Sequence, residues 1–228
     1  SRIMKDKTIL EDFKKTYPEK FPSPEAIFSR IHAGDQIFIG TVCGEPQYLV
    51  HELVDYVNKN PKAFFDAELI HIWTLGVAPY TDEKFQDNFR LDSFFVGDST
   101  RGSVNRGAAD YTPVFLSSVP DLFRSEMVPV DIALVQTSLP DKHGYLSLGI
   151  SVDVVKSALK KSEIVVAQVN ENMPRTHGDG FVHINDIDFV LPHDEPLLEY
   201  SVKAPNDIVQ KIGKYVARII EDGSTIQV

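Results

Sequence analysis

Residues 40–46, GTVCGEP, end an apolar run with two glycines, a cysteine, a glutamate and a proline. Residues of these types are used in phosphate-binding loops, in cysteine nucleophiles, in backbone anion sites and in plain turns. A P-loop needs GxxxxGK followed by Ser or Thr, and a dinucleotide-binding fold needs GxGxxG. This stretch contains neither pattern, and Glu45 would place negative charge beside a phosphate. The stretch is therefore not typical of a phosphate-binding loop.

Cys43 is the chain's only cysteine, and a cysteine nucleophile needs a neighbouring base and a stabilised thiolate. Burial as a small apolar side chain is the commoner fate of a free cysteine. The two glycines would let backbone N–H groups approach a ligand and bind a developing oxyanion without side-chain chemistry. A tight turn between a strand and a helix needs the same glycines, and the residues alone favour the turn.

Two further loops are rich in polar residues and turn formers, residues 136–149 (QTSLPDKHGYLSLG) and residues 170–183 (NENMPRTHGDGFVH). Each follows an apolar strand, and ligands of open α/β sheets bind at the carboxyl ends of strands. We therefore expect both loops to line one crevice with the first loop. Arg175 is a candidate for holding a carboxylate, and His143 or His177 for carrying protons. Alternatively, Asp141 and Asp179 cap turns and the histidines make local hydrogen bonds.

The histidines and acidic residues of the last third do not match a metal-binding pattern. Asp186 and Asp188 would share one face of a strand, near His183, but their spacing is not that of known metal ligands. We therefore predict no metal site.

The elements that position these loops follow from the hydrophobic pattern. Ser23 before Pro24 predicts the start of a short helix over residues 24–33, an apolar strand follows at 36–40, and residues 48–60 have one apolar helical face. Further strands are expected at residues 68–74, 93–97, 110–118, 130–138 and 163–170. Further helices are expected at residues 81–89, 101–107, 152–161 and 205–223.

The strands predict the fold class. Residues 132–136 (IALVQ) and 164–169 (IVVAQV) are apolar on both faces, as in a parallel sheet that helices cover on both sides. We therefore expect an open, largely parallel α/β fold. Residues 181–192 alternate apolar and polar side chains, which predicts an edge strand or a small antiparallel element near residues 180–200.

Composition limits the possible partners. Asp and Glu number 33 against 23 Lys and Arg, so the chain would repel a nucleic-acid backbone. No apolar stretch approaches the roughly 20 residues that span a bilayer. The polar N-terminus is not typical of a signal peptide, and a single cysteine suits a reducing compartment. We expect a cytoplasmic protein without nucleic-acid or membrane partners.

An internal echo, meaning a similarity between two segments of the chain, predicts the domain organisation. Residues 30–39 (RIHAGDQIFI) and 218–228 (RIIEDGSTIQV) share a helix end, a glycine and an entering strand, with one residue inserted. Domains seldom end inside a strand-forming run, because its backbone groups need partners. We therefore expect residues 1–200 to form an N-terminal domain. Residues 201–228 would be a helix and first strand that lead into a second domain absent from this chain.

Six stretches, in order along the chain, carry a resemblance to a known family: IFIGTVCGEPQ, HIWTLGVAPYTDEKFQDNFR, SVNRGAADYTPVFLSSVP, TSLPDKHGYLSLGISVD, VNENMPRTHGDGFVHINDIDF and PHDEPLLEY. Together they resemble the N-terminal half of the acetyl-CoA hydrolase/transferase family, especially its 4-hydroxybutyrate and butyrate:acetate CoA-transferases. The resemblance spans nearly the whole chain.

The resemblance implies a two-domain enzyme of related α/β halves that holds coenzyme A and an acyl group in the cleft between them. In this family a glutamate of the second half attacks the acyl-CoA to form an anhydride, then carries CoA as a thioester until a second carboxylate takes it. That glutamate would lie beyond Val228, so this segment alone should be inactive. The implied partners are acyl-CoA, a short-chain carboxylate, the C-terminal half and further copies in a homo-oligomer. Acyl-CoA would be a substrate, and no permanently bound cofactor is implied.

The resemblance also reverses the preference for a plain turn at residues 40–46. In the family this loop faces the thioester, and one backbone amide of the loop helps to form the oxyanion hole. By position, Cys43 N–H is the first candidate, with Val42 and Gly44 as neighbours and the thiol incidental. The substrate-binding candidates are Gly40, Glu45, Pro46, His143, Arg175 and His177. Two alternatives stay open, an acetyl-CoA hydrolase in which water replaces the acceptor carboxylate, and a non-catalytic acyl-CoA-binding module.

Overall fold

The computed structural model describes residues 2–76, 78–202 and 204–227. Backbone contacts group these residues into two units, of which the first ends at Leu198 and the second begins at Glu199.

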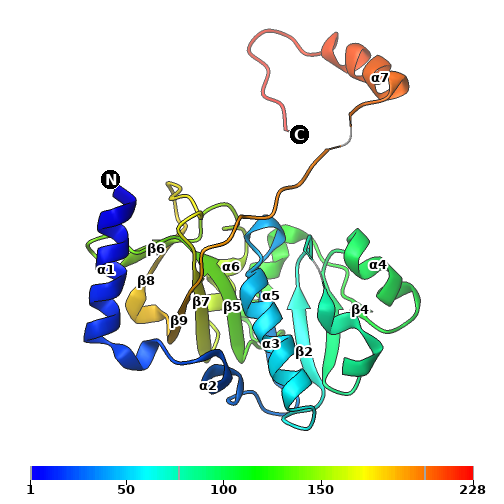
Figure 1. The fold of residues 1–228 in the computed structure, drawn as a ribbon. Helices are drawn as coiled ribbons and strands as arrows, with labels where there is room; N and C mark the ends of the chain where they lie inside the picture. The colour runs from blue at the N-terminus through cyan, green and yellow to red at the C-terminus, as the bar shows by residue number, and fades with distance from the viewer. Residues whose placement is uncertain (1, 77, 203, 228) are drawn as a thin grey trace. The chain divides into compact units, whose positions relative to one another are not determined.

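A seven-stranded sheet forms the centre of the first unit (Figure 1). Its strand order is β4-β3-β2-β1-β5-β7-β9, and every neighbouring pair is parallel. The strands are β1 (Gln36–Ile39), β2 (Ala67–His71), β3 (Phe89–Ser93), β4 (Asp110–Tyr111), β5 (Ile132–Thr137), β7 (Ile164–Val169) and β9 (Phe189–Pro192). Because the strands are parallel, the loops that follow them meet at one edge of the sheet. This confirms the predicted open, largely parallel α/β fold.

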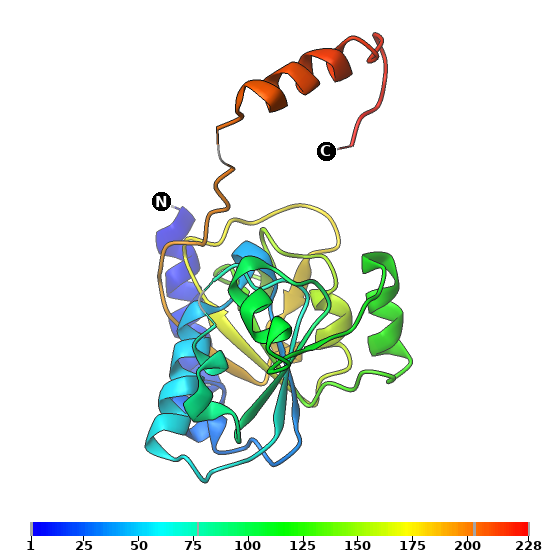
Figure 2. The same cartoon turned by 90° about the vertical axis from the view of Figure 1, so that its right-hand side faces the viewer.

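Helices cover both faces of the sheet, as the two views in Figures 1 and 2 show. The helices of the first unit are α1 (Arg2–Thr16), α2 (Pro24–Phe28), α3 (Gln47–Lys59), α4 (Asp98–Asn105), α5 (Val119–Arg124) and α6 (Val155–Leu159), whereas α7 (Asp207–Ala217) belongs to the second unit. Alternate side chains of a strand enter opposite cores. Ile37 and Ile39 of β1 pack in the core that includes α2 and α3, whereas Phe38 packs with α5 and α6. The apolar face predicted for α3 is buried.

A separate antiparallel pair joins β6 (Tyr145–Ser147) to β8 (Phe181–His183). Tyr145 lies opposite His183, and Ser147 lies opposite Phe181. Residues 181–192 therefore contain both predicted alternatives, because β8 belongs to this antiparallel element and β9 is the edge strand of the large sheet.

Three predicted elements of the first unit differ most from the structure. Residues 81–89 form no long helix but 3-10 turns at Pro79–Thr81 and Glu83–Phe85, followed by β3. β3 lies at Phe89–Ser93 instead of residues 93–97. The FRLDS alternation buries residues 89, 91 and 93, and this period of two is a better strand signal than the neighbouring phenylalanines. The strand predicted at 110–118 is only the two-residue β4, and Pro113 could not donate a hydrogen bond in a longer one.

The second unit contains α7, whose N-cap Asn206 accepts a hydrogen bond from Val209 N–H. Residues 224–227 form no strand, so the strand expected from the internal echo is not formed there, and its last residue, Val228, lies outside the described residues. The assignment of residues 201–228 to a second domain remains a prediction. None of the helices that the structure describes is both long and apolar enough to cross a membrane.

Candidate functional site

The loop of residues 40–46 follows β1, which lies between β2 and β5 in the sheet. Gly40 N–H donates to the Leu134 carbonyl of β5 at 2.8 Å. Residues Val42–Gly44 form a 3-10 turn, and α3 begins at Gln47. The loop is therefore anchored to the centre of the sheet at its first residue.

Gly44 packs closely against Ser151. A Cβ atom at this glycine would lie 2.5 Å from Ser151 Cβ, which is closer than any real contact. Gly44 N–H donates to Ser151 Oγ at 3.0 Å and to the Thr41 carbonyl at 3.0 Å. Gln136 Nε2 donates to the carbonyl of Glu45 at 3.2 Å. The second glycine of the motif is therefore required by a close approach, and its amide is already used.

Val42 adopts a φ of 48°, in the left-handed region that a β-branched residue rarely occupies. Its N–H donates to the Trp73 carbonyl at 3.1 Å, and the neighbouring Thr41 hydroxyl donates to the Asp153 carboxylate. Such a conformation persists only where the surrounding contacts hold it. Contacts from the segments after β2 and before α6 hold it here.

Among the described residues, two N–H groups of this loop have no hydrogen-bond acceptor, that of Thr41, which is 1% exposed, and that of the half-buried Cys43. The N–H groups of Val42 and Gly44 both have internal acceptors. Cys43 is half-buried and carries a free thiol. Its amide is thus held in a fixed position with its donor capacity unused.

Glu45 is 1% exposed, and its Oε2 accepts a hydrogen bond from Gly76 N–H at 3.2 Å. Burial raises the pKa of Glu45 to about 7, and the hydrogen bond from Gly76 partly opposes this effect. Within the described chain, Glu45 Oε1 and Gln47 Nε2 are buried polar atoms without a hydrogen-bond partner. The carboxyl group therefore lies beneath the loop and links it to the segment after β2.

His71 ends β2 and is fully buried. Its Nδ1 hydrogen-bonds with Thr74 Oγ1 at 2.8 Å, and its Nε2 with the Tyr80 hydroxyl at 2.9 Å. Burial lowers the pKa of His71 to about 3, so the ring stays neutral. The ring therefore positions the loop that follows β2, a role that the sequence analysis did not identify.

The start of α3 is capped by side chains from β7 and from the segment after β9. Tyr48 N–H donates to Glu195 Oε1 at 3.2 Å, and Leu49 N–H donates to Gln168 Oε1 at 3.3 Å. These helix-start donors are therefore not free to bind an anion. This network was not predicted from the sequence, although Gln136 and Gln168 occupy paired positions in two largely apolar strands, β5 and β7.

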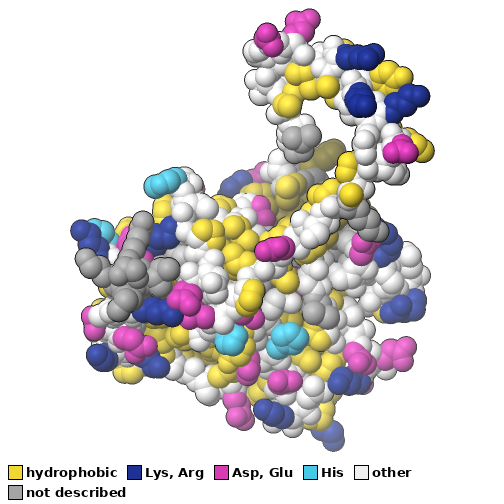
Figure 3. All heavy atoms as spheres, turned by 45° about the horizontal axis from the view of Figure 1, so that its top comes forward, with side chains coloured by type: hydrophobic (Ala, Val, Ile, Leu, Met, Phe, Trp, Pro, Cys, Tyr) yellow, Lys and Arg dark blue, Asp and Glu magenta, His cyan; other side chains and the backbone are white. Residues whose placement is uncertain are grey.

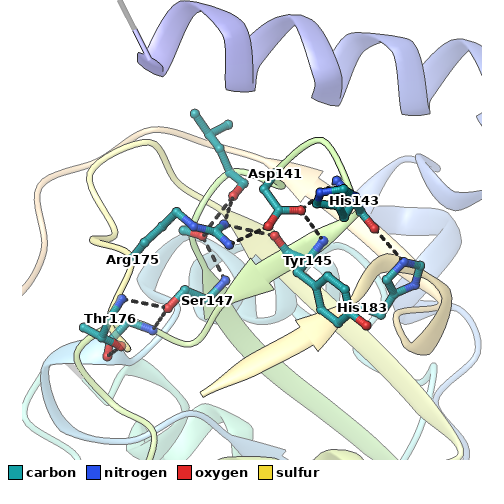
Figure 4. Close-up of polar contacts among 10 residues, drawn as sticks. Asp141, His143, Tyr145, Ser147, Arg175, Thr176 and His183 are labelled. Carbon is teal, nitrogen blue, oxygen red and sulfur yellow. Dashed lines mark hydrogen bonds and ion pairs between the residues drawn. The ribbon is translucent and has the colours of Figure 1, made fainter. Parts of the chain in front are cut away.

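Arg175 lies in a polar cluster built from residues 138–147 and 175–183 (Figure 4). Its guanidinium donates to the carbonyls of Leu139 at 3.1 Å and Tyr145 at 3.0 Å. It also donates to Asp141 Oδ2 at 3.1 Å and lies over the Phe181 ring, 5.1 Å from the centroid. These contacts engage Arg175 with its own protein and join the two predicted loops.

Asp141 organises the turn in the same cluster. Its carboxylate accepts hydrogen bonds from His143 N–H at 2.9 Å and Tyr145 N–H at 3.0 Å. Partial burial opposes ionisation, but these two hydrogen bonds and Arg175 hold the pKa of Asp141 below its ordinary value. The turn alternative that the sequence left open for residue 141 therefore matches these contacts.

His143 and His177 are both exposed. The His143 carbonyl hydrogen-bonds with His183 Nε2 at 2.9 Å, as Figure 4 shows. In the described part of the chain, no hydrogen bond connects either imidazole to residues 40–46. Their proton-carrying roles remain predictions. Within the same residues, no three His, Cys, Asp or Glu side chains cluster closely enough to hold a metal ion.

Comparison with known proteins identifies relatives over nearly the whole chain. Residues 4–199 match the sequence profile of the acetyl-CoA hydrolase/transferase N-terminal domain. The chain is 42% identical to the 4-hydroxybutyrate coenzyme A transferase of Clostridium kluyveri over 95% of this chain and 49% of that protein. It is 38% identical to the succinyl-CoA:acetate/propanoyl-CoA:succinate CoA transferase of Fasciola hepatica over 92% of this chain and 44% of that protein. The chain thus spans about half the length of these curated relatives.

Solved structures share the fold. The 4-hydroxybutyrate CoA-transferase of Porphyromonas gingivalis superposes with a TM-score of 0.74 at 26% identity, covering 93% of this chain and 49% of that one. RipA of Yersinia pestis superposes with a TM-score of 0.82 at 24% identity, covering 93% of this chain and 51% of that one.

Proposed function

The chain belongs to the acetyl-CoA hydrolase/transferase family, and we propose that it forms the N-terminal half of an acyl-CoA:carboxylate CoA-transferase. The full protein would move CoA between short-chain carboxylates of the 4-hydroxybutyrate, butyrate or acetate type. The CoA-transferase relatives support this proposal, and so does the half-length match to them.

The unused N–H of Cys43 carries the proposal for the site. Attack of a carboxylate on a thioester places negative charge on the acyl oxygen, and a fixed N–H donor stabilises that charge. The loop around Cys43 N–H is held by Leu134, Trp73 and Ser151, so the donor needs no reorganisation during the reaction. The Cys43 thiol has no role in this scheme.

The attacking carboxylate would belong to a glutamate in the C-terminal half. It would form an acyl anhydride with release of CoA thiolate, which then attacks the glutamyl carbonyl to give a glutamyl-CoA thioester and release the first carboxylate. The acceptor carboxylate would reverse these two steps. CoA is thus a substrate, and the cytoplasmic location and assembly into a homo-oligomer belong to the same proposal.

The first test compares the full-length protein with this 228-residue chain in an assay of acetyl-CoA with butyrate. The full-length protein should transfer CoA and the isolated chain should not. Turnover by the isolated chain would contradict the placement of the nucleophile. CoA release that does not depend on the acceptor would identify a hydrolase, and binding of acyl-CoA without turnover would identify a binding module.

The second test removes only the donor. In the full-length protein, an ester bond in place of the Cys43 amide, introduced with the α-hydroxy analogue of cysteine, should lower kcat/KM by about 10²–10³-fold. An unchanged kcat/KM would show that another group binds the acyl oxygen.

A further inference from the structure

An apolar pocket of about 340 Å³ lies beside the loop of residues 40–46. This volume is within the roughly 300–1,000 Å³ of small-molecule sites. Its described lining residues are Val42, Ile72, Trp73, Phe94, Phe95, Val114, Leu116, Val119 and Asp153. Most of them follow β1, β2, β3 and β4 at the carboxyl edge of the sheet, Val119 begins α5, and Asp153 lies just before α6. Asp153 is the charged member of this lining.

The aromatic wall of the pocket has a fixed shape. The Trp73 ring packs against Phe95 with 5.2 Å between centroids. A Cβ atom at Gly97 would lie 2.4 Å from Trp73 Nε1, so only glycine at that position leaves room for the indole. Ile72, Phe94 and Val119 are buried and form the floor. The pocket is therefore a built feature of the fold.

The pocket is open to solvent and lies in a first unit whose surface mixes charged and hydrophobic side chains. In the view of Figure 3, charged side chains of both signs are intermingled around the margin of the first unit, and hydrophobic side chains are exposed between them. At the pocket itself, Leu116 is 58% exposed and Phe95 is 54% exposed, so an apolar ligand can reach it.

Val42 connects the pocket to the proposed oxyanion donor. Its side chain lines the pocket, its N–H is held by the Trp73 carbonyl, and the next residue carries the unused N–H. An acyl group whose oxygen accepts from Cys43 N–H therefore has an apolar cavity one residue away. Resting on the proposed function, we propose that this pocket holds the hydrocarbon tail of an uncharged acyl chain and discriminates against acyl groups that carry a second carboxylate.

Two physical effects produce this selectivity. Each methylene that enters an apolar pocket raises kcat/KM by about 10–200-fold. The kcat/KM for butyryl and longer acyl groups should therefore exceed that for acetyl. A second carboxylate would lose its hydration among aromatic and aliphatic walls and would meet the negative charge of Asp153. Asp153 is held by the Thr41 hydroxyl and by Val154 N–H, which keep its carboxylate at the rim. A succinyl group is therefore a poor occupant.

The first experiment fills the pocket. In the full-length protein, Val114→Phe should lower kcat/KM for hexanoyl-CoA at least about tenfold relative to acetyl-CoA. Val128→Phe is the matched control, because Val128 is a half-buried valine on the same core that does not line the pocket. An equal fall with acetyl-, butyryl- and hexanoyl-CoA would overturn the proposal and indicate that another part of the protein, or a second copy, occupies the pocket.

The second experiment changes the charge of the rim. Leu116→Arg should raise kcat/KM for succinyl-CoA relative to butyryl-CoA by about tenfold, because a cation offsets Asp153 and pairs with the second carboxylate. Phe115→Arg is the control, since Phe115 is 83% exposed next to Leu116 but outside the lining. The same change in both variants would contradict a subsite at residue 116.

The two proposals can fail separately. If the wild-type full-length protein transfers CoA but Val114→Phe leaves the chain-length preference unchanged, the pocket proposal fails and the proposed function stands. If the wild-type protein transfers CoA from none of the tested acyl-CoAs, both fail.

Discussion

Residues 40–46 and the cluster around Arg175 are two polar regions of the first unit that use their hydrogen-bonding groups in opposite ways. In the Arg175 cluster, the side chains with the most evident chemistry are engaged with each other and with the backbone. In the loop, surrounding contacts fix most backbone groups, yet the N–H of the half-buried Cys43 has no acceptor among the described residues.

The difference indicates where a ligand can gain binding energy. A guanidinium that already serves internal acceptors would have to break those hydrogen bonds to hold a substrate, whereas an unused and fixed N–H has nothing to break. Side-chain type alone would rank Arg175 above Cys43. The hydrogen-bond partners reverse that order.

The largest effect is expected from Gly44→Ala in the full-length protein. The added Cβ would lie 2.5 Å from Ser151 Cβ and 2.7 Å from its Oγ, so the turn that holds Cys43 N–H must move. Misplacing this donor should raise the barrier by about 2.7–4 kcal/mol, which is a loss of roughly 10²–10³-fold in kcat/KM.

Gly102→Ala provides the control for this substitution. Its Cβ would meet only the flexible end of Arg106, at 3.3 Å, and an alanine within a helix is favourable. Activity within about threefold of wild type is expected for Gly102→Ala. Equal activity of both variants would show that the loop geometry is not needed.

The buried Glu45 carboxyl group beneath the loop should make the free energy of unfolding depend on pH. Burial raises its pKa from 4.5 to about 7, so the folded state binds the proton more tightly than the unfolded state does. The stability contribution is therefore fully present below the ordinary pKa of 4.5 and is lost as pH rises to about 7. The loss amounts to roughly 3 kcal/mol, at about 1.4 kcal/mol for each pKa unit.

Glu45→Gln keeps the size of the side chain and cannot ionise. Its free energy of unfolding, measured against wild type from pH 4 to pH 8 in urea, should rise relative to wild type across this window and then level off. Glu11→Gln, at an exposed position, should give a flat difference. A flat difference for Glu45→Gln as well would show that folding does not raise the pKa of Glu45.

Arg175→Ala should destabilise the full-length protein by about 2 kcal/mol, since the carbonyls of Leu139 and Tyr145 lose their charged donor. Arg124→Ala breaks an ion pair whose two side chains are 60% and 72% exposed, and it should change the unfolding midpoint little. Kinetics of Arg175→Ala at saturating acyl-CoA test whether Arg175 also binds the acceptor carboxylate. A large rise in the KM for the acceptor carboxylate, without loss of stability, would show that Arg175 binds the substrate.

The fold was predictable from the sequence where a hydrophobic pattern is compatible with only one structural environment. Apolar strands such as β5 and β7 predict a covered parallel sheet, because only burial on both faces tolerates them. β3 was misplaced because a pair of adjacent phenylalanines hid the alternation that precedes it. β4 was overestimated because β-favouring residues in a short edge segment do not show where its sheet partners end.

The site was predictable to a smaller extent. Glycine spacing pointed to the loop, but the sequence does not show that Ser151, which lies far along the chain, fills the space beside Gly44. The sequence also does not show which of the three adjacent N–H groups of residues 42–44 is left without an acceptor. That depends on long-range contacts, such as the hydrogen bond from Val42 N–H to the Trp73 carbonyl. The buried partners of Glu45 and His71 are hidden for the same reason.

The smallest effect is expected from Cys43→Ala. The substitution removes the half-buried thiol but keeps the backbone N–H, and the hydrogen bonds of Val42 and Gly44 that fix the turn do not involve the side chain. Steady-state kinetics of the full-length protein should therefore give kcat/KM within about threefold of wild type, less than 0.7 kcal/mol of barrier. A loss above roughly a hundredfold would mean that the thiol takes part in the chemistry, because removing a half-buried thiol for structural reasons alone does not account for about 2.7 kcal/mol of transition-state stabilisation. In that case the contrast between a backbone donor and engaged side chains would not hold for this loop.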